Sequence, residues 1–83
     1  MYATDVKALI EKKKDVKFAV SEGPVSAIAV FRPSEGDDME LLLFNERMFL
    51  LFDEIRIADS QGIELYFKNL CVVSIDVTEW REL

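Results

Sequence analysis

Residues 39–57, MELLLFNERMFLLFDEIRI, constrain the fold more than any other stretch of the chain. Their apolar side chains come in runs of four and five residues with little alternation. A regular element built from this stretch therefore has no face suited to water. Any fold of the chain must cover it on both sides.

The chain has 83 residues, which fits a single domain spanning residues 1–83. Charged residues make up 31% of it, too many for a membrane span, and its longest apolar run, residues 48–52, is far shorter than the roughly 20 residues that cross a bilayer. The first residues contain no apolar signal core, and the single cysteine, Cys71, cannot form an intrachain disulfide. We therefore expect a cytoplasmic protein with no membrane partner.

Hydrophobic periodicity predicts one helix followed by antiparallel strands. Val6, Leu9 and Ile10 lie at the i, i+3, i+4 spacing of one helical stripe. With Thr4 as its cap, this helix is expected over residues 4–14. Alternation of apolar and polar residues then predicts strands at residues 16–20, 63–67 and 73–77. Apolar runs predict strands without a wet face at residues 25–31 and 41–44, and a long strand at residues 48–57 that bends where Asp53 and Glu54 interrupt it.

Residues 46–57 also fit a helix capped by Asn45. Strand is favoured because Ile55 and Ile57 alternate with polar residues and lead directly into a hairpin turn at residues 59–62. In that turn we expect Gly62 to take the left-handed conformation. The remaining turns are expected at residues 21–24, 33–38, 45–46 and 68–69.

The expected fold is α+β, with one N-terminal helix packed on a five- to six-stranded antiparallel meander. The helix can cover only one face of this sheet, filled by side chains such as Phe18, Val20, Ile28 and Val30. The surplus falls on the other face, where the candidates for self-association are Phe31, Leu42, Phe44 and Phe49. Burying four such side chains is worth about 6–12 kcal/mol. Either the sheet curls into a small barrel around them, or another chain covers them.

Catalytic groups are scarce in the sequence. Histidine is absent, which removes the commonest general base and metal ligand, and Cys71 beside two valines is read as a buried small hydrophobe. Three isolated glycines make no phosphate-binding loop. We therefore expect a protein that is not an enzyme and that holds no cofactor.

Carboxylates are the only plentiful functional groups. Glu35, Asp37, Asp38 and Glu40 cluster in the sequence, but without the spacing of a calcium loop, and a solvated turn explains them more simply than a metal site. The same holds for residues 53–54 with Asp59, where edge charges that prevent sheet-to-sheet pairing are the simpler interpretation. An enzyme would need a metal at one of these places.

The net charge of −6 divides unevenly, because residues 1–17 carry +2 and the remainder carries −8. An acidic body repels nucleic acid and attracts basic proteins, so we expect a protein partner with a basic surface and no direct nucleic-acid binding outside the lysine-rich first segment. The candidate contact residues are the four clustered carboxylates and Tyr66, an interface-type aromatic on the polar side of its strand.

These features favour a small acidic protein-binding module of the inhibitor or immunity type, with phosphate-mimicking carboxylates. In composition alone it resembles phage inhibitors of bacterial defence nucleases, such as anti-CRISPR proteins. The alternative function is a structural subunit that forms a homodimer or ring through its apolar strands.

Overall fold

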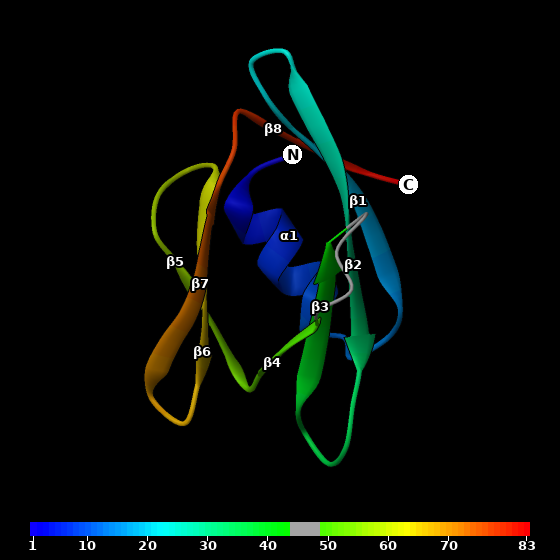
Figure 1. The fold of residues 1–83 in the computed structure, drawn as a ribbon, viewed down its shortest axis with the longest axis vertical. Helices are drawn as coiled ribbons and strands as arrows, with labels where there is room; N and C mark the ends of the chain where they lie inside the picture. The colour runs from blue at the N-terminus through cyan, green and yellow to red at the C-terminus, as the bar shows by residue number, and fades with distance from the viewer. Residues whose placement is uncertain (44–48) are drawn as a thin grey trace.

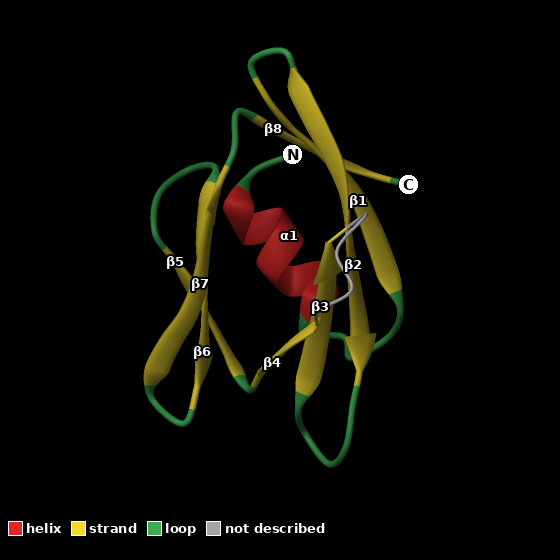
Figure 2. Cartoon of the chain, in the orientation of Figure 1, coloured by secondary structure: helices red, strands yellow, loops and turns green. Residues whose placement is uncertain are grey.

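The computed structural model of the protein describes residues 1–43 and 49–83. These residues form one helix and antiparallel strands, so the predicted α+β class is confirmed (Figures 1 and 2). The elements are α1 (Ala3–Ile10), β1 (Val16–Glu22), β2 (Val25–Pro33), β3 (Met39–Leu43), β4 (Phe49–Phe52), β5 (Glu54–Ile57), β6 (Gly62–Phe67), β7 (Leu70–Asp76) and β8 (Glu79–Glu82). None of the helices in the part of the chain described is long and apolar enough to cross a membrane.

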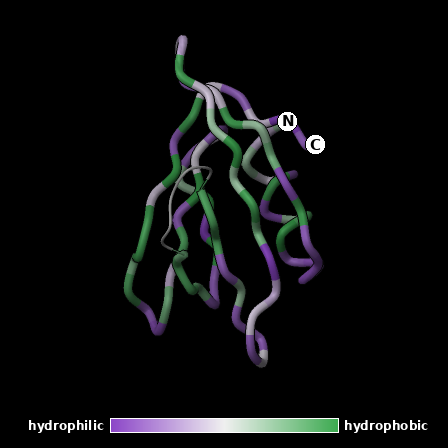
Figure 3. Tube along the Cα trace, turned by 45° about the vertical axis from the view of Figure 1, so that its right-hand side comes forward, coloured by the Kyte–Doolittle hydropathy of each residue, from purple (hydrophilic) through white to green (hydrophobic). Residues whose placement is uncertain are grey.

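The strands divide into two sheets that lie on either side of α1 (Figure 1). The larger sheet has the order β4-β3-β2-β1-β8, and the smaller one has the order β5-β6-β7. Across residues 1–43 and 49–83 the sheets stay separate and do not close into a barrel. Hydrophobic residues follow the strands, while hydrophilic residues mark several of the turns (Figure 3).

Two corners carry the chain from one sheet to the other. At the first, Asp53 separates β4 from β5, and its backbone N–H donates to the carbonyl of Tyr66 at 2.8 Å. At the second, between β7 and β8, the backbone N–H and the hydroxyl of Thr78 both donate to the Ser21 carbonyl at 2.8 Å. The expected single strand over residues 48–57 is thus two strands in the described part, and the strand interpretation is confirmed over residues 49–57.

Four buried aromatic rings form one row across the inner face of the larger sheet, and we call this row the aromatic file. Phe18 makes edge-to-face contacts with Trp80 at 5.5 Å and with Phe31 at 5.9 Å between ring centroids, and Phe31 contacts Phe52 in the same way at 6.0 Å. Such T-shaped pairs add to the stabilisation that comes from burial alone. Val6 and Ile10 of α1 and Ile63 and Leu65 of β6 complete the core.

The prediction that Phe31 lies on the outer face is wrong, because Phe31 is 0% exposed. In β2, Ala29 and Phe31 point into the core and Ile28 and Val30 point outward, the reverse of the expected assignment. The cause is the register of the first hairpin, in which Val16 pairs with Phe31 and Phe18 with Ala29. Leu42 and Phe49 do lie on the outer face, and Phe44 falls outside the described residues.

The helix is shorter than predicted and begins earlier. Its N-terminus is stabilised by Asp5, whose carboxylate accepts the backbone N–H of Tyr2 at 2.9 Å, rather than by Thr4. It ends at Ile10 because the chain must reverse to enter β1, and Lys13 takes a left-handed conformation with φ of 57° in that reversal.

Gly62 is not left-handed, contrary to expectation: the glycines with positive φ are Gly23 and Gly36. Gly62 opens β6, where an added Cβ would lie 2.9 Å from the carboxylate of Asp59. A larger residue at this position would therefore require the Asp59 carboxylate to shift. At residues 68–69 both Lys68 and Asn69 have positive φ, which suits the twist of a two-residue hairpin.

Cys71 is exposed, so the prediction that it is buried is wrong. A β-bulge shifts the β6–β7 register after Leu65, which pairs with Val73, so that Tyr66 pairs with Cys71. The extra residue, Val72, reverses the inward and outward alternation and turns the thiol to the outer face.

We expect Cys71 to react completely with an aromatic disulfide reagent in the folded protein, without denaturant. The measurement is the thiol released per chain under native conditions and in urea. Equal stoichiometry, with native labelling complete within minutes, supports the bulge. A thiol protected until the protein unfolds would contradict the register described here.

Candidate functional site

The outer face of the smaller sheet carries an ordered group of polar and aromatic side chains. We call Glu54, Arg56, Glu64, Tyr66 and Asp76 the Tyr66 surface. Their positions follow from cross-strand pairing, since Glu54 pairs with Tyr66, Arg56 with Glu64, and Asp76 with Gly62. Paired residues of antiparallel strands point to the same face. The alternate residues, Ile55, Ile63 and Leu65, are buried in the core.

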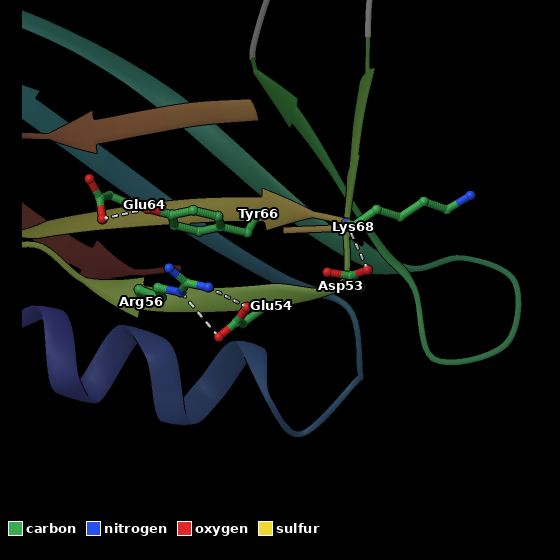
Figure 4. Close-up of polar contacts among 6 residues, drawn as sticks. All are labelled: Asp53, Glu54, Arg56, Glu64, Tyr66 and Lys68. Carbon is green, nitrogen blue, oxygen red and sulfur yellow. Dashed lines mark hydrogen bonds and ion pairs between the residues drawn. The ribbon is translucent and has the colours of Figure 1, made fainter. Parts of the chain in front are cut away.

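Arg56 lies at the centre of this surface (Figure 4). Its guanidinium stacks on the ring of Tyr66, with Cζ 3.8 Å from the ring centroid. Two of its nitrogens donate to the two carboxylate oxygens of Glu54, each at 3.1 Å. The Tyr66 hydroxyl donates to Glu64 at 3.3 Å. Four side chains from two strands are thereby held in one connected array.

The electrostatics follow from these contacts. The hydrogen bonds from Arg56 to Glu54 raise the pKa of the guanidinium, a group that is charged throughout the physiological range in any case. The bidentate pair neutralises Glu54, while Glu64 and Asp76 form no ion pair with any described residue. The Tyr66 surface therefore combines a neutralised, ordered centre with two uncompensated carboxylates.

The first corner fixes the end of this surface. The carboxylate of Asp53 accepts the backbone N–H of Lys68 at 3.1 Å, and this ties the corner to the turn between β6 and β7 (Figure 4). Together with the hydrogen bond from the Asp53 N–H to the Tyr66 carbonyl, it holds the backbone on both sides of Phe67, where β6 ends. Tyr66 thus sits on rigid backbone rather than on a loop.

The four clustered carboxylates predicted from the sequence lie elsewhere, in and beside the loop between β2 and β3 of the larger sheet. Glu40 belongs to β3 and forms an ion pair with Arg32 at 2.8 Å. Asp38 is half-buried, and the carbonyl of Asp37 accepts a hydrogen bond from Lys13. Glu35 and Asp37 are exposed, whereas Asp38 and Glu40 are partly buried.

The described residues contain no group of three or more histidine, cysteine or carboxylate side chains arranged to hold a metal ion. Asp59 and Asp76 approach each other across Gly62, each within 3.3 Å of the position of a Cβ there. Two exposed carboxylates supply too few ligands for a protein-made metal site. Asp59 has a structural role, because it accepts the backbone N–H of Gln61 at 2.9 Å.

Sequence reasoning identified Tyr66 but not Arg56, Glu54 or Glu64. Their shared face could have been found from the hairpin, because residues that alternate with Ile55, Ile63 and Leu65 must point outward together. Comparisons of the chain with protein-family models, with curated proteins and with solved structures give no match. The Tyr66 surface is therefore the feature of the molecule from which a function can be inferred.

Proposed function

We propose that the protein is a non-enzymatic protein-binding module whose Tyr66 surface binds a basic region of a partner protein. The observation that carries this proposal is the array in which Arg56 is stacked on Tyr66 and closed by Glu54. In this proposal the protein is an inhibitor- or immunity-type protein of the cytoplasm. Its target is a protein whose own function uses a basic surface, such as a nucleic-acid-binding groove.

The order of the array supports binding on energetic grounds. Tyrosine and arginine are the residue types that most often carry interface affinity. Side chains that are already fixed lose less conformational entropy when a partner arrives. Tyr66 is half-buried before any partner binds, with the Arg56 guanidinium 3.8 Å from the centroid of its ring. The side chains of this surface should therefore lose little conformational entropy when a partner binds.

The charge of the surface supports a basic partner. The guanidinium of Arg56 is neutralised by Glu54, which leaves Glu64 and Asp76 as the groups that an incoming lysine or arginine would meet. The chain as a whole carries −6, which steers cationic surfaces toward it at low ionic strength. The affinity of such a complex should fall as salt is added.

We expect an arginine-rich peptide, titrated into the ¹⁵N-labelled protein at low salt, to shift the amide signals of residues 54–56, 64–66 and 74–76. The double variant Glu64→Gln, Asp76→Asn should weaken binding about two- to fivefold per charge removed, as expected for exposed ion pairs. Tyr66→Ala should weaken it further because Arg56 loses its support. The same variants should lose the natural partner when the protein is used as bait in extracts of its source cell.

The matched control is Glu35→Gln, Asp37→Asn, which changes the net charge by the same amount in the loop between β2 and β3. It should retain most of the affinity and the salt dependence. If the loop variant loses binding while Glu64→Gln, Asp76→Asn keeps it, the acidic loop is the site and the Tyr66 surface is not. If neither variant changes the affinity, the proposal of an acidic binding module is wrong.

A further inference from the structure

The outer face of the larger sheet is apolar at its centre. Cross-strand pairing places Lys17, Val30, Leu42 and Phe49 in one row across β1, β2, β3 and β4. Ile28 and Leu51 flank this row on the same face. Phe49 is 55% exposed and Leu51 37%, while Ile28, Val30 and Leu42 are half-buried. We call these five apolar residues the outer apolar surface.

The other side of the same face is hollowed. A concavity of about 600 Å³ lies over β8, β1 and β2. Its lining includes the apolar side chains of Ala19, Ile28 and Leu83, together with Glu79 and Arg81 from the edge strand. A protruding apolar side chain on β4 and a partly apolar hollow beside β8 therefore occupy the two opposite edges of one sheet.

We propose that two copies of the chain associate face to face through the outer apolar surface, with Phe49 of each copy seated in the concavity of the other. The sheet order β4-β3-β2-β1-β8 has β2 at its centre. A two-fold axis that runs along β2, in the plane of the interface, exchanges the two edge strands. It thus places β4 of one copy over β8 of the other, twice, as a closed symmetric dimer requires.

The protruding Phe49 and the concavity on the same sheet make this face complementary to itself, and its charges permit a second copy to dock there. Two molecules that each carry −6 repel each other, so they can meet only where carboxylates do not face carboxylates. The outer face of the larger sheet meets this condition. Among the described residues of this face, Glu40 is paired with Arg32 at 2.8 Å, and two cations, Lys17 and Arg81, accompany one further acid, Glu79. Arg81 at the concavity can also pack against the incoming ring of Phe49.

The size of the face sets the strength of the dimer. Five strands about 4.8 Å apart, with roughly 3.3 Å per residue along each strand, give a face of roughly 400–500 Å². Two such faces bury about 800–1,000 Å², which is below the range of stable interfaces and is typical of weak, transient ones. The dimer should therefore be weak, with a dissociation constant in the micromolar range. The two Tyr66 surfaces stay free, because they lie on the sheet at the other side of α1 (Figure 1).

The test is sedimentation equilibrium of the full chain from about 5 to 500 µM. We expect the average mass to rise from the monomer value of 9.5 kDa toward twice that value. Added salt should strengthen the dimer, because it screens the repulsion between two acidic molecules. This salt dependence is opposite in sign to that expected for a basic partner, so dimerisation and the proposed function can fail independently. Glu64→Gln, Asp76→Asn should not disrupt the dimer.

Phe49→Lys should weaken the dimer at least tenfold, while the near-ultraviolet signal of buried Trp80 reports that the variant is folded. Leu70→Lys is the matched control, since Leu70 is 71% exposed on the smaller sheet, and it should dimerise normally. Arg81→Glu should weaken its own homodimer, and mixing it with Phe49→Lys should restore a heterodimer, because the introduced lysine of one variant then meets the introduced glutamate of the other. A wild-type protein that stays monomeric at 500 µM, a dimer indifferent to Phe49→Lys, or a mixture without heterodimer would overturn the proposal.

Discussion

Replacing Phe31 with alanine should lower the free energy of unfolding by about 3–5 kcal/mol, as is typical for a phenylalanine in a closed core. Phe31 is 0% exposed and contacts the rings of both Phe18 and Phe52, so the truncation leaves a cavity at the middle of the aromatic file. A domain of 83 residues has a total stability of about 4–12 kcal/mol at the usual value per residue. The variant should therefore be close to unfolding at 37 °C.

The measurement is urea denaturation followed by the fluorescence of Trp80, at about 1 µM so that association does not contribute. Phe49→Ala makes the same change at a side chain that is 55% exposed, and it should cost less than about 1.5 kcal/mol. The two variants separate the observed face assignment from its reverse. A loss for Phe31→Ala as small as that for Phe49→Ala would show that β2 presents its other face to the core.

The first hairpin shows why the class was predictable from the sequence but this face was not. Alternation identifies β1 as a strand and a short apolar run identifies β2, but in β2 both sets of alternate residues are apolar, so composition does not choose the face that is buried. The two-residue turn at Gly23 and Pro24 decides the matter, because it pairs Glu22 with Val25 and hence Phe18 with Ala29. The register follows from the turn length alone. The expected inward placement of Ile28 and Val30 had no such register behind it.

The corners and the bulge were harder to predict from the sequence. That residues 49–57 contribute strands to two different sheets depends on Asp53, whose backbone and carboxylate are both bonded to the end of β6. Those contacts are long-range and leave no local pattern. In β7, the run from Leu70 to Val73 is apolar throughout, so nothing in the sequence marks Val72 as the extra residue of a bulge. The exposure of Cys71 follows only from that bulge.

In the candidate site, too, the residues with a local sequence signal could be predicted and those that depend on strand pairing could not. Tyr66 was predicted as a contact residue because it alternates with buried residues on one strand, a local signal. The neighbours that give it an ordered surface, Glu54 and Arg56, come from the paired strand and require the hairpin register. For Glu40 the sequence cluster does not show the cross-strand neighbour, because its ion pair with Arg32 depends on the register between β2 and β3.

We expect the second large loss of stability when Trp80 is replaced. It is 1% exposed, contacts Phe18 edge to face at 5.5 Å, and donates its indole N–H to the Gln61 carbonyl at 2.8 Å. This bond joins β8 of the larger sheet to the turn between β5 and β6 in the smaller sheet. Trp80→Ala should therefore lower the free energy of unfolding by about 3–5 kcal/mol. Trp80→Phe keeps most of the packing but leaves the carbonyl without its donor, at a cost of about 1–3 kcal/mol.

Because these variants lack the indole, their unfolding in urea must be followed by far-ultraviolet circular dichroism. Tyr2→Ala is the control, since Tyr2 is 63% exposed and its ring should contribute less than about 0.5 kcal/mol. The graded order of alanine, phenylalanine and wild type distinguishes the ring's burial from its hydrogen bond. If Trp80→Phe were as stable as wild type, the bond to Gln61 would contribute nothing to holding the two sheets together, and packing of the aromatic file alone would account for the core.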